Sequence, residues 1–143
     1  MIALAMVSLF AWSGSHQAAV QASGKKTLHA FLAASKGSKR TTTFSADAPV
    51  IYAFWEGEAL DIGDTIGVVW IAEDIGGPNP KETEIRRAVY RIFKQEQVGA
   101  FSLSRPAGQT WPVGKYRVEL YINGGIADLV KFTIKPGVTI ETN

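Results

Sequence analysis

The chain contains no cysteine and only two histidines in 143 residues. The lack of cysteine excludes disulfide bonds, thiolate metal sites, a cysteine nucleophile and a lipid anchor on cysteine. His16 and His29 both precede the main part of the chain, so a histidine-based triad or multi-histidine metal site is excluded there. No glycine-rich phosphate loop precedes a helix, which argues against nucleotide binding. We therefore predict no enzyme activity, no cofactor and no metal.

The chain also has little excess of one sign of charge, because the formal net charge is only +2. This value is too small to indicate a nucleic-acid partner. The charges are nevertheless unevenly distributed along the chain. Residues 25–40 carry five basic side chains and no acidic one, whereas residues 41–80 carry seven acidic side chains and no basic one. Two such blocks can form complementary patches that favour head-to-tail contact or docking on a charged partner.

The sequence also lacks a long hydrophobic run of the kind that spans a membrane, which needs about 20 residues. The uncharged run Ile2–Trp12 has instead the length of a signal-peptide core, and Val20 and Ala22 suit signal peptidase. We predict cleavage after Ala22 and a periplasmic or extracellular location. Because no Lys or Arg precedes this run, retention of residues 1–22 as a membrane anchor is the first alternative, and a buried apolar helix is the second.

Residues 23–40 are predicted to form a basic linker. Leu28, Phe31 and Leu32 recur at helical spacing, so the alternative is a short amphipathic helix on a membrane or partner surface. Membrane contact, if it occurs, is expected from residues 2–40. A solvated tether is favoured because so few apolar residues bind a membrane weakly.

From Thr41 onward the pattern predicts strands. Residues 50–56 and 65–73 are rich in β-branched and aromatic side chains, and both are apolar on nearly every position. Residues 115–122 alternate apolar and polar side chains, as in a strand with one wet face, and a second alternating run follows the turn at Asn123. Residues 41–46 and 98–103 are further candidate strands.

Residues 81–97 are ambiguous. Ile85, Val89 and Phe93 belong to a set of apolar positions with helical spacing, so this segment taken alone predicts a helix. We favour a strand because strands are predicted on both sides and a sandwich needs one here. A short helix crossing the sandwich is the alternative.

These elements predict an all-β fold, an immunoglobulin-like antiparallel β-sandwich of about seven strands over residues 41–135, with a tail at 136–143. Tyr116 can fill the place of the tyrosine that in such folds bonds back to the preceding loop. Val118 stands where antibody domains carry cysteine, and Trp70 is the expected core tryptophan. Residues 101–106 and 111–118, with the hairpin after them, resemble the ends of immunoglobulin-like domains in bacterial exported proteins. The resemblance covers Thr41–Ile134 and implies a fold and a compartment, without any catalytic residue.

The function predicted from this sequence is that of a non-catalytic envelope domain, an accessory subunit that contacts proteins and belongs to a membrane-associated complex. The alternative is a carbohydrate- or ligand-binding module with an aromatic platform, and a third hypothesis is a hydrolase that uses the acids of residues 61–74. The predicted partner-binding residues are Tyr121, Trp111, Arg117, Arg105 and Trp55. Burial of Trp55 and Tyr52 in the core, and of Trp111 over the sandwich end, is the competing interpretation. The acids can equally cap turn amides, or supply a calcium site that lacks a recognisable loop pattern.

Overall fold

The computed structural model describes residues 24–138, which form eight strands and no helix. The predicted signal or anchor segment, residues 1–22, lies outside the described residues. The strands are β1 (Thr27–Ala33), β2 (Thr43–Ser45), β3 (Val50–Glu58), β4 (Thr65–Asp74), β5 (Thr83–Arg91), β6 (Val98–Ser104), β7 (Gly114–Ile122) and β8 (Gly125–Lys135). In residues 24–138 no helix is long and apolar enough to cross a membrane.

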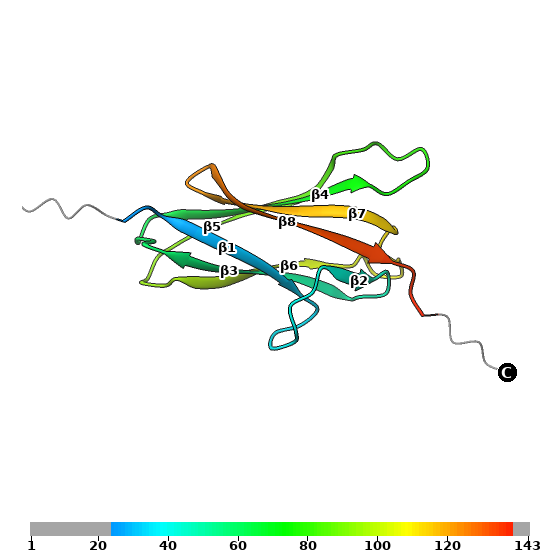
Figure 1. Ribbon diagram of the computed structural model, residues 1–143, viewed down its shortest axis with the longest axis horizontal. Helices are drawn as coiled ribbons and strands as arrows, with labels where there is room; N and C mark the ends of the chain where they lie inside the picture. Colours follow the sequence, from blue (N-terminus) through cyan, green and yellow to red (C-terminus); the bar gives the residue numbers. More distant parts are fainter. Residues whose placement is uncertain (1–23, 139–143) are drawn as a thin grey trace, which may run out of the picture.

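The eight described strands pack as two layers (Figure 1). The smaller sheet has the order β1-β3-β6, and the larger has the order β2-β8-β7-β4-β5. All neighbouring strands are antiparallel except β2 and β8, which run parallel. The described chain begins and ends at opposite ends of the sandwich. The predicted all-β sandwich is confirmed, with one strand more than expected.

The extra strand corrects the prediction of a basic linker or short helix in residues 23–40. Thr27–Ala33 is strand β1, paired antiparallel with β3, and its side chains Leu28 and Leu32 are buried. A spacing of four residues fits a helical turn, but it also returns a strand to the same face, because side chains in a strand alternate. The domain therefore begins at β1 rather than at Thr41, and the strand expected at residues 41–46 is the short β2.

Residues 81–97 contain strand β5, which confirms the strand interpretation over the helical one. Within the described residues β5 pairs only with β4, so it forms one edge of the larger sheet. Nearly all of its side chains are exposed, because β5 extends the larger sheet past the area that the smaller sheet covers. The apolar residues of this segment therefore show no clear period-two burial, which explains the ambiguity of its sequence.

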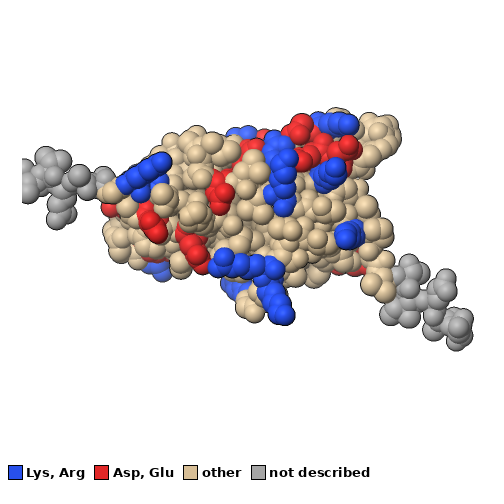
Figure 2. All heavy atoms as spheres, viewed as in Figure 1, with Lys and Arg blue, Asp and Glu red and all other residues tan. Residues whose placement is uncertain are grey.

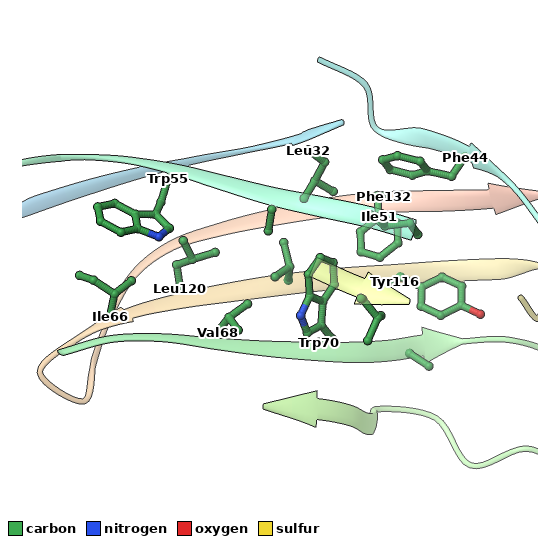
Figure 3. Close-up of a cluster of buried hydrophobic side chains, with 14 of the residues drawn as sticks. Leu32, Phe44, Ile51, Trp55, Ile66, Val68, Trp70, Tyr116, Leu120 and Phe132 are labelled. Carbon is green, nitrogen blue, oxygen red and sulfur yellow. The ribbon is translucent and has the colours of Figure 1, made fainter. Parts of the chain in front are cut away.

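The core lies between the two sheets (Figure 3). Val68 and Trp70 of β4 and Leu120 of β7 face inward from the larger sheet, whereas Ile51 and Trp55 of β3 face inward from the smaller one. Each large side chain that is fully buried in this way stabilises the fold by roughly 1.5–3 kcal/mol. This burial holds the sheets together without an inter-sheet disulfide.

Tyr116 has the role predicted from its sequence position. Its hydroxyl donates a hydrogen bond to the carbonyl oxygen of Pro112 at 2.5 Å, and its ring stacks on Phe132 with centroids 5.3 Å apart. Burial raises the pKa of Tyr116 to about 12. Val118, two residues later, is fully buried in the place where antibody domains carry cysteine. The loop before β7 is thus attached to the core as in immunoglobulin-type sandwiches.

Candidate binding surface

Two of the predicted partner-binding residues are buried, which corrects the prediction that they are exposed. Trp55 is 2% exposed and Trp111 is 6% exposed. Trp55 lies on the inward side of β3, with Ile51 and Ala53. Trp111 covers one end of the sandwich, where its indole N–H donates to the carbonyl oxygen of Ala48 at 2.7 Å. Neither indole presents a free ring face to a partner, in agreement with the competing interpretation.

The other three predicted residues lie in different places. Arg117 and Tyr121 share the outer face of the larger sheet, because residues an even number apart on β7 point the same way. Arg105 directly follows β6 in the smaller sheet, so it does not join this pair. Tyr121 is half-buried on the solvent-facing side of β7, as the alternation of apolar and polar residues in this strand predicts.

Arg117 is held by carboxylates of its own chain. Its guanidinium Nε lies 2.8 Å from Glu119, its Nη1 lies 3.5 Å from Glu73, and Nη1 also contacts Glu82. These carboxylates, Glu119 first, raise the pKa of Arg117. Figure 2 shows acidic and basic side chains side by side where the β4–β5 loop leaves the sheet. Because its Nε and Nη1 donors are engaged by these carboxylates, Arg117 stabilises the sheet surface and offers less of its guanidinium to a partner.

Tyr121 borders a shallow hollow on the same face. Its hydroxyl donates to Glu119 at 2.5 Å, a bond that lowers the pKa of the Glu119 carboxyl and raises that of Tyr121. The hollow measures about 460 Å³ and also contacts Arg87 and Val89. It lies over Gly67, which pairs with Val89 on one side and Tyr121 on the other. The absence of a side chain at this glycine leaves room for part of the hollow.

The outer face of the smaller sheet carries a row of aromatic rings that the sequence analysis missed as a group. The rings of Phe31 and Phe54 stack with centroids 5.3 Å apart and planes at 15°, and those of Tyr52 and Phe54 with centroids 5.7 Å apart and planes at 25°. All three side chains are half-buried. They point away from the core, since their neighbours along the strands, such as Ala53 and Leu32, are buried. We call Phe31, Phe54 and Tyr52 the aromatic row.

One end of the aromatic row is covered by a cation and the side toward β6 is open. The guanidinium of Arg40 lies 3.7 Å from the ring centroid of Phe31 and forms an ion pair with Glu56 at 3.2 Å. On β6, the residues opposite Phe54 and Tyr52 are the small Ala100 and Ser102. Small neighbours leave the edges of the rings accessible from that side.

Part of this row has a visible signal in the sequence. Residues 50–56 are apolar on both sides of the strand, which indicates a sheet whose outer face is also partly covered. The interpretation of residues 23–40 as a linker or short helix separated Phe31 from the strand that carries Phe54. The row forms only where β1 pairs with β3, so local sequence patterns do not reveal it.

The acidic residues of the β3–β4 loop, Asp61 and Asp64, form ion pairs and hydrogen bonds within the domain. Asp64 is buried, and its carboxylate accepts hydrogen bonds from Lys26 at 2.6 Å, from the side-chain amide of Asn123 at 2.9 Å and from the backbone N–H of Asp61 at 2.8 Å. These bonds, that of Asn123 first, lower the pKa of Asp64 to about 2. Asp64 therefore caps a turn amide, which is the structural role expected for these acids as the alternative to catalysis. In residues 24–138 no group of three or more His, Asp or Glu side chains is arranged to hold a metal ion.

The basic and acidic blocks of the sequence meet inside one molecule. Lys26 forms ion pairs with Asp61 and Asp64, and Arg40 pairs with Glu56. The predicted complementary patches are thus engaged with each other at these positions, because β1 pairs with β3.

Comparison with known proteins supports the architecture. No protein-family model matches the chain, and no curated protein sequence matches it significantly. An immunoglobulin-like protein from Pseudomonas aeruginosa has a TM-score of 0.55 at 11% identity over 80% of this chain and 99% of its own. A β-glucosidase from Listeria innocua in complex with glucose has a TM-score of 0.52 at 11% identity over 80% of this chain. The chain spans only 16% of that enzyme. The fold is therefore an immunoglobulin-like β-sandwich.

Proposed function

We propose that the chain is a non-catalytic binding domain that contacts a protein partner through the outer face of its smaller sheet. The observation that carries this proposal is the aromatic row, three stacked rings that are half-buried on the outer face of the smaller sheet, with Arg40 over one end. Aromatic side chains and arginine are the residue types that most often dominate protein interfaces. A partner that buries the remaining exposed area of these rings gains free energy at roughly 25 cal/mol per Å² of apolar surface.

A protein fits this face better than a sugar does. A sugar packs flat against an open ring face, whereas Phe31 and Phe54 stack on each other and Arg40 covers Phe31. The ring edges and the hydroxyl of Tyr52 remain available on the outer face of the sheet, beside the small Ala100 and Ser102. Such a surface suits the side chains of a second protein.

The hollow beside Tyr121 supports a second candidate function, the binding of a carbohydrate or another small polar ligand. Its volume of about 460 Å³ lies within the range of small-molecule sites, roughly 300–1,000 Å³. Arg87 and Glu119 offer a donor and an acceptor at its wall, with Val89 as an apolar contact. Titration with candidate sugars, followed by the fluorescence of Tyr121→Trp, tests this candidate, and a flat signal removes it.

We further propose that the domain is exported and works as an envelope accessory subunit. The support is the signal-like sequence of residues 1–22. Since Thr27–Ala33 is part of a sheet, the proposed membrane contact is now confined to residues before Gly24. The intact mass of the native protein tests this point, because it shows whether residues 1–22 are removed.

Site-specific photo-crosslinking tests the binding face. A photoreactive phenylalanine analogue replaces Phe54 in the full chain, produced in its native host, and Tyr121 is replaced in a matched control. We expect a discrete protein adduct from position 54 and a weaker one or none from position 121. Adducts from position 121 alone would place the contact on the larger sheet and contradict the proposal.

A further inference from the structure

Strand β5 presents an unused edge of the larger sheet. Its nine residues hydrogen-bond to β4 on one side, and no other strand of residues 24–138 pairs with them on the other. Both of its faces are exposed over nearly the whole length. Unpaired main-chain N–H and C=O groups on such an edge are a template for another extended chain.

The edge is basic. Arg86, Arg87 and Arg91 lie on β5, and Lys94 follows it. Arg87 is paired with Glu84 at 2.6 Å, but neither Arg86 nor Arg91 forms an ion pair with any residue of the described part. The register places Arg86 opposite Trp70 and Arg91 opposite Thr65, on the two opposite faces of the strand. A chain added to β5 thus meets a free cation on either face.

Apolar side chains accompany these cations. Val89 is 71% exposed, Phe93 is 68% exposed and Val98, at the start of β6, is 63% exposed. A hollow of about 310 Å³ lies between β5 and β6, lined by Val89, Tyr90 and Phe101 among others. The edge therefore offers main-chain groups and positive charge, with apolar side chains on it and beside it.

We propose that β5 binds an extended acidic segment of another protein, which adds to the larger sheet as a further strand. Charge complementarity selects the occupant, since acidic side chains on either face of the added strand meet Arg86 or Arg91. A second copy of this chain is disfavoured, because β5 carries three arginines and one glutamate, so pairing β5 with β5 brings together two strands with an excess of like charge. This surface is separate from the aromatic row, so the proposal does not depend on the function proposed above.

The test is fluorescence anisotropy with a labelled peptide of repeated Glu-Glu-Val-Val, as long as β5, and the full chain, because this repeat places glutamates on both faces of an added strand. An otherwise identical peptide of Lys and Val controls for charge, and one with central prolines controls for strand pairing, because proline cannot donate to a ladder. We expect only the first peptide to bind appreciably. In hydrogen exchange it should protect amides of β5.

Variants of the protein complete the test. R86E/R91E should weaken binding of the Glu–Val peptide by about tenfold or more, because both cross-strand charge pairs become repulsive. K36E/K39E makes the same change of charge in the exposed β1–β2 loop and should alter binding by about twofold at most, since salt screens distant charges. Thermal unfolding verifies that both variants fold. Equal binding to R86E/R91E and K36E/K39E, equal binding of the proline peptide, or no binding of the Glu–Val peptide would each overturn the proposal.

Discussion

The ammonium group of Lys26 lies 2.6 Å from one carboxylate oxygen of Asp64 and 2.7 Å from the other. This ion pair joins the residue before β1 to the residue before β4. Only 9% of the Asp64 side chain is exposed, and 28% of the Lys26 side chain, so solvent screens the pair less than it screens a surface pair. The contact fixes the start of β1 against the sandwich.

The first prediction concerns how the free energy of unfolding depends on pH in the acid range. The pKa of Asp64 is lowered from 3.8 to about 2 in the folded chain. A group with a depressed folded pKa stabilises the fold above its unfolded pKa, and this contribution is lost as the pH falls through the folded value. We therefore expect the free energy of unfolding to fall by roughly 1–2 kcal/mol from Asp64 alone between about pH 4 and pH 2.

Asp64→Asn removes the titrating group and should flatten this part of the profile while lowering stability near neutral pH. Lys26→Met keeps most of the aliphatic stem and tests the ion pair alone. Its effect should be smaller, because Asn123 and the Asp61 amide still bond to Asp64. Urea unfolding at several pH values measures both. An unchanged acid profile in Asp64→Asn would contradict the assignment.

The second prediction concerns Tyr116→Phe. The change removes the hydrogen bond to Pro112 and leaves a carbonyl oxygen without its partner, so the free energy of unfolding should fall by about 1 kcal/mol. Burial raises the pKa of Tyr116 from 10.0 to about 12, so the native chain should also lose stability as the pH rises from about 10 to about 12. Tyr116→Phe should lack this loss of stability at alkaline pH. Tyr52→Phe, on the outer face, is the matched control for the loss of a tyrosine hydroxyl and should lower the free energy of unfolding less than Tyr116→Phe does.

The third prediction concerns a close approach in the core. A side chain at Gly99 would collide with the indole of Trp55. We expect Gly99→Ala to lower the free energy of unfolding by about 1–3 kcal/mol and to shift the tryptophan fluorescence. Gly125→Ala is the matched control, because a methyl group there meets only an ordinary contact, 3.6 Å from the carbonyl oxygen of Ile122. Equal stability of the two variants would refute the collision.

The fourth prediction is a double-mutant cycle on the larger sheet. Arg117→Met leaves the half-buried carboxylate of Glu119 without its cation and leaves Glu73 only the exposed Lys131, 3.6 Å away, so stability should fall by about 1–3 kcal/mol. In Arg117→Met/Glu119→Gln the repulsion is relieved, so the combined loss should be smaller than the sum of the single losses. Urea denaturation at low and high salt measures the cycle. Strict additivity would show that the two side chains are not coupled.

The sequence predicts most of this fold because its strands obey a period of two. In β7, Tyr116, Val118 and Leu120 are buried as their alternation requires. The same logic fails for β1, where Leu28 and Leu32 are four residues apart and fit either a strand or a helix. Only pairing with β3, a tertiary contact, decides between them.

The candidate surface was less predictable for a related physical reason. Tryptophan is common both in cores and at interfaces, so composition alone cannot tell where Trp55 and Trp111 lie. Alternation in β3 places Trp55 with Ile51 on the buried side, which implies that Phe54 points outward. The aromatic row itself joins two strands that are separated by the β1–β2 loop and β2, and local sequence patterns carry no information on such pairing.

The most direct test of the account is the affinity of the partner that crosslinks at position 54 for two single variants of the full chain. Phe54→Ala should weaken binding by about 30-fold or more, as a hot-spot truncation worth about 2 kcal/mol does. Leu129→Ala removes an apolar side chain from the larger sheet, 40% exposed, and should change affinity by about twofold at most. A large loss from Leu129→Ala with no loss from Phe54→Ala would contradict the assignment of the binding face to the smaller sheet.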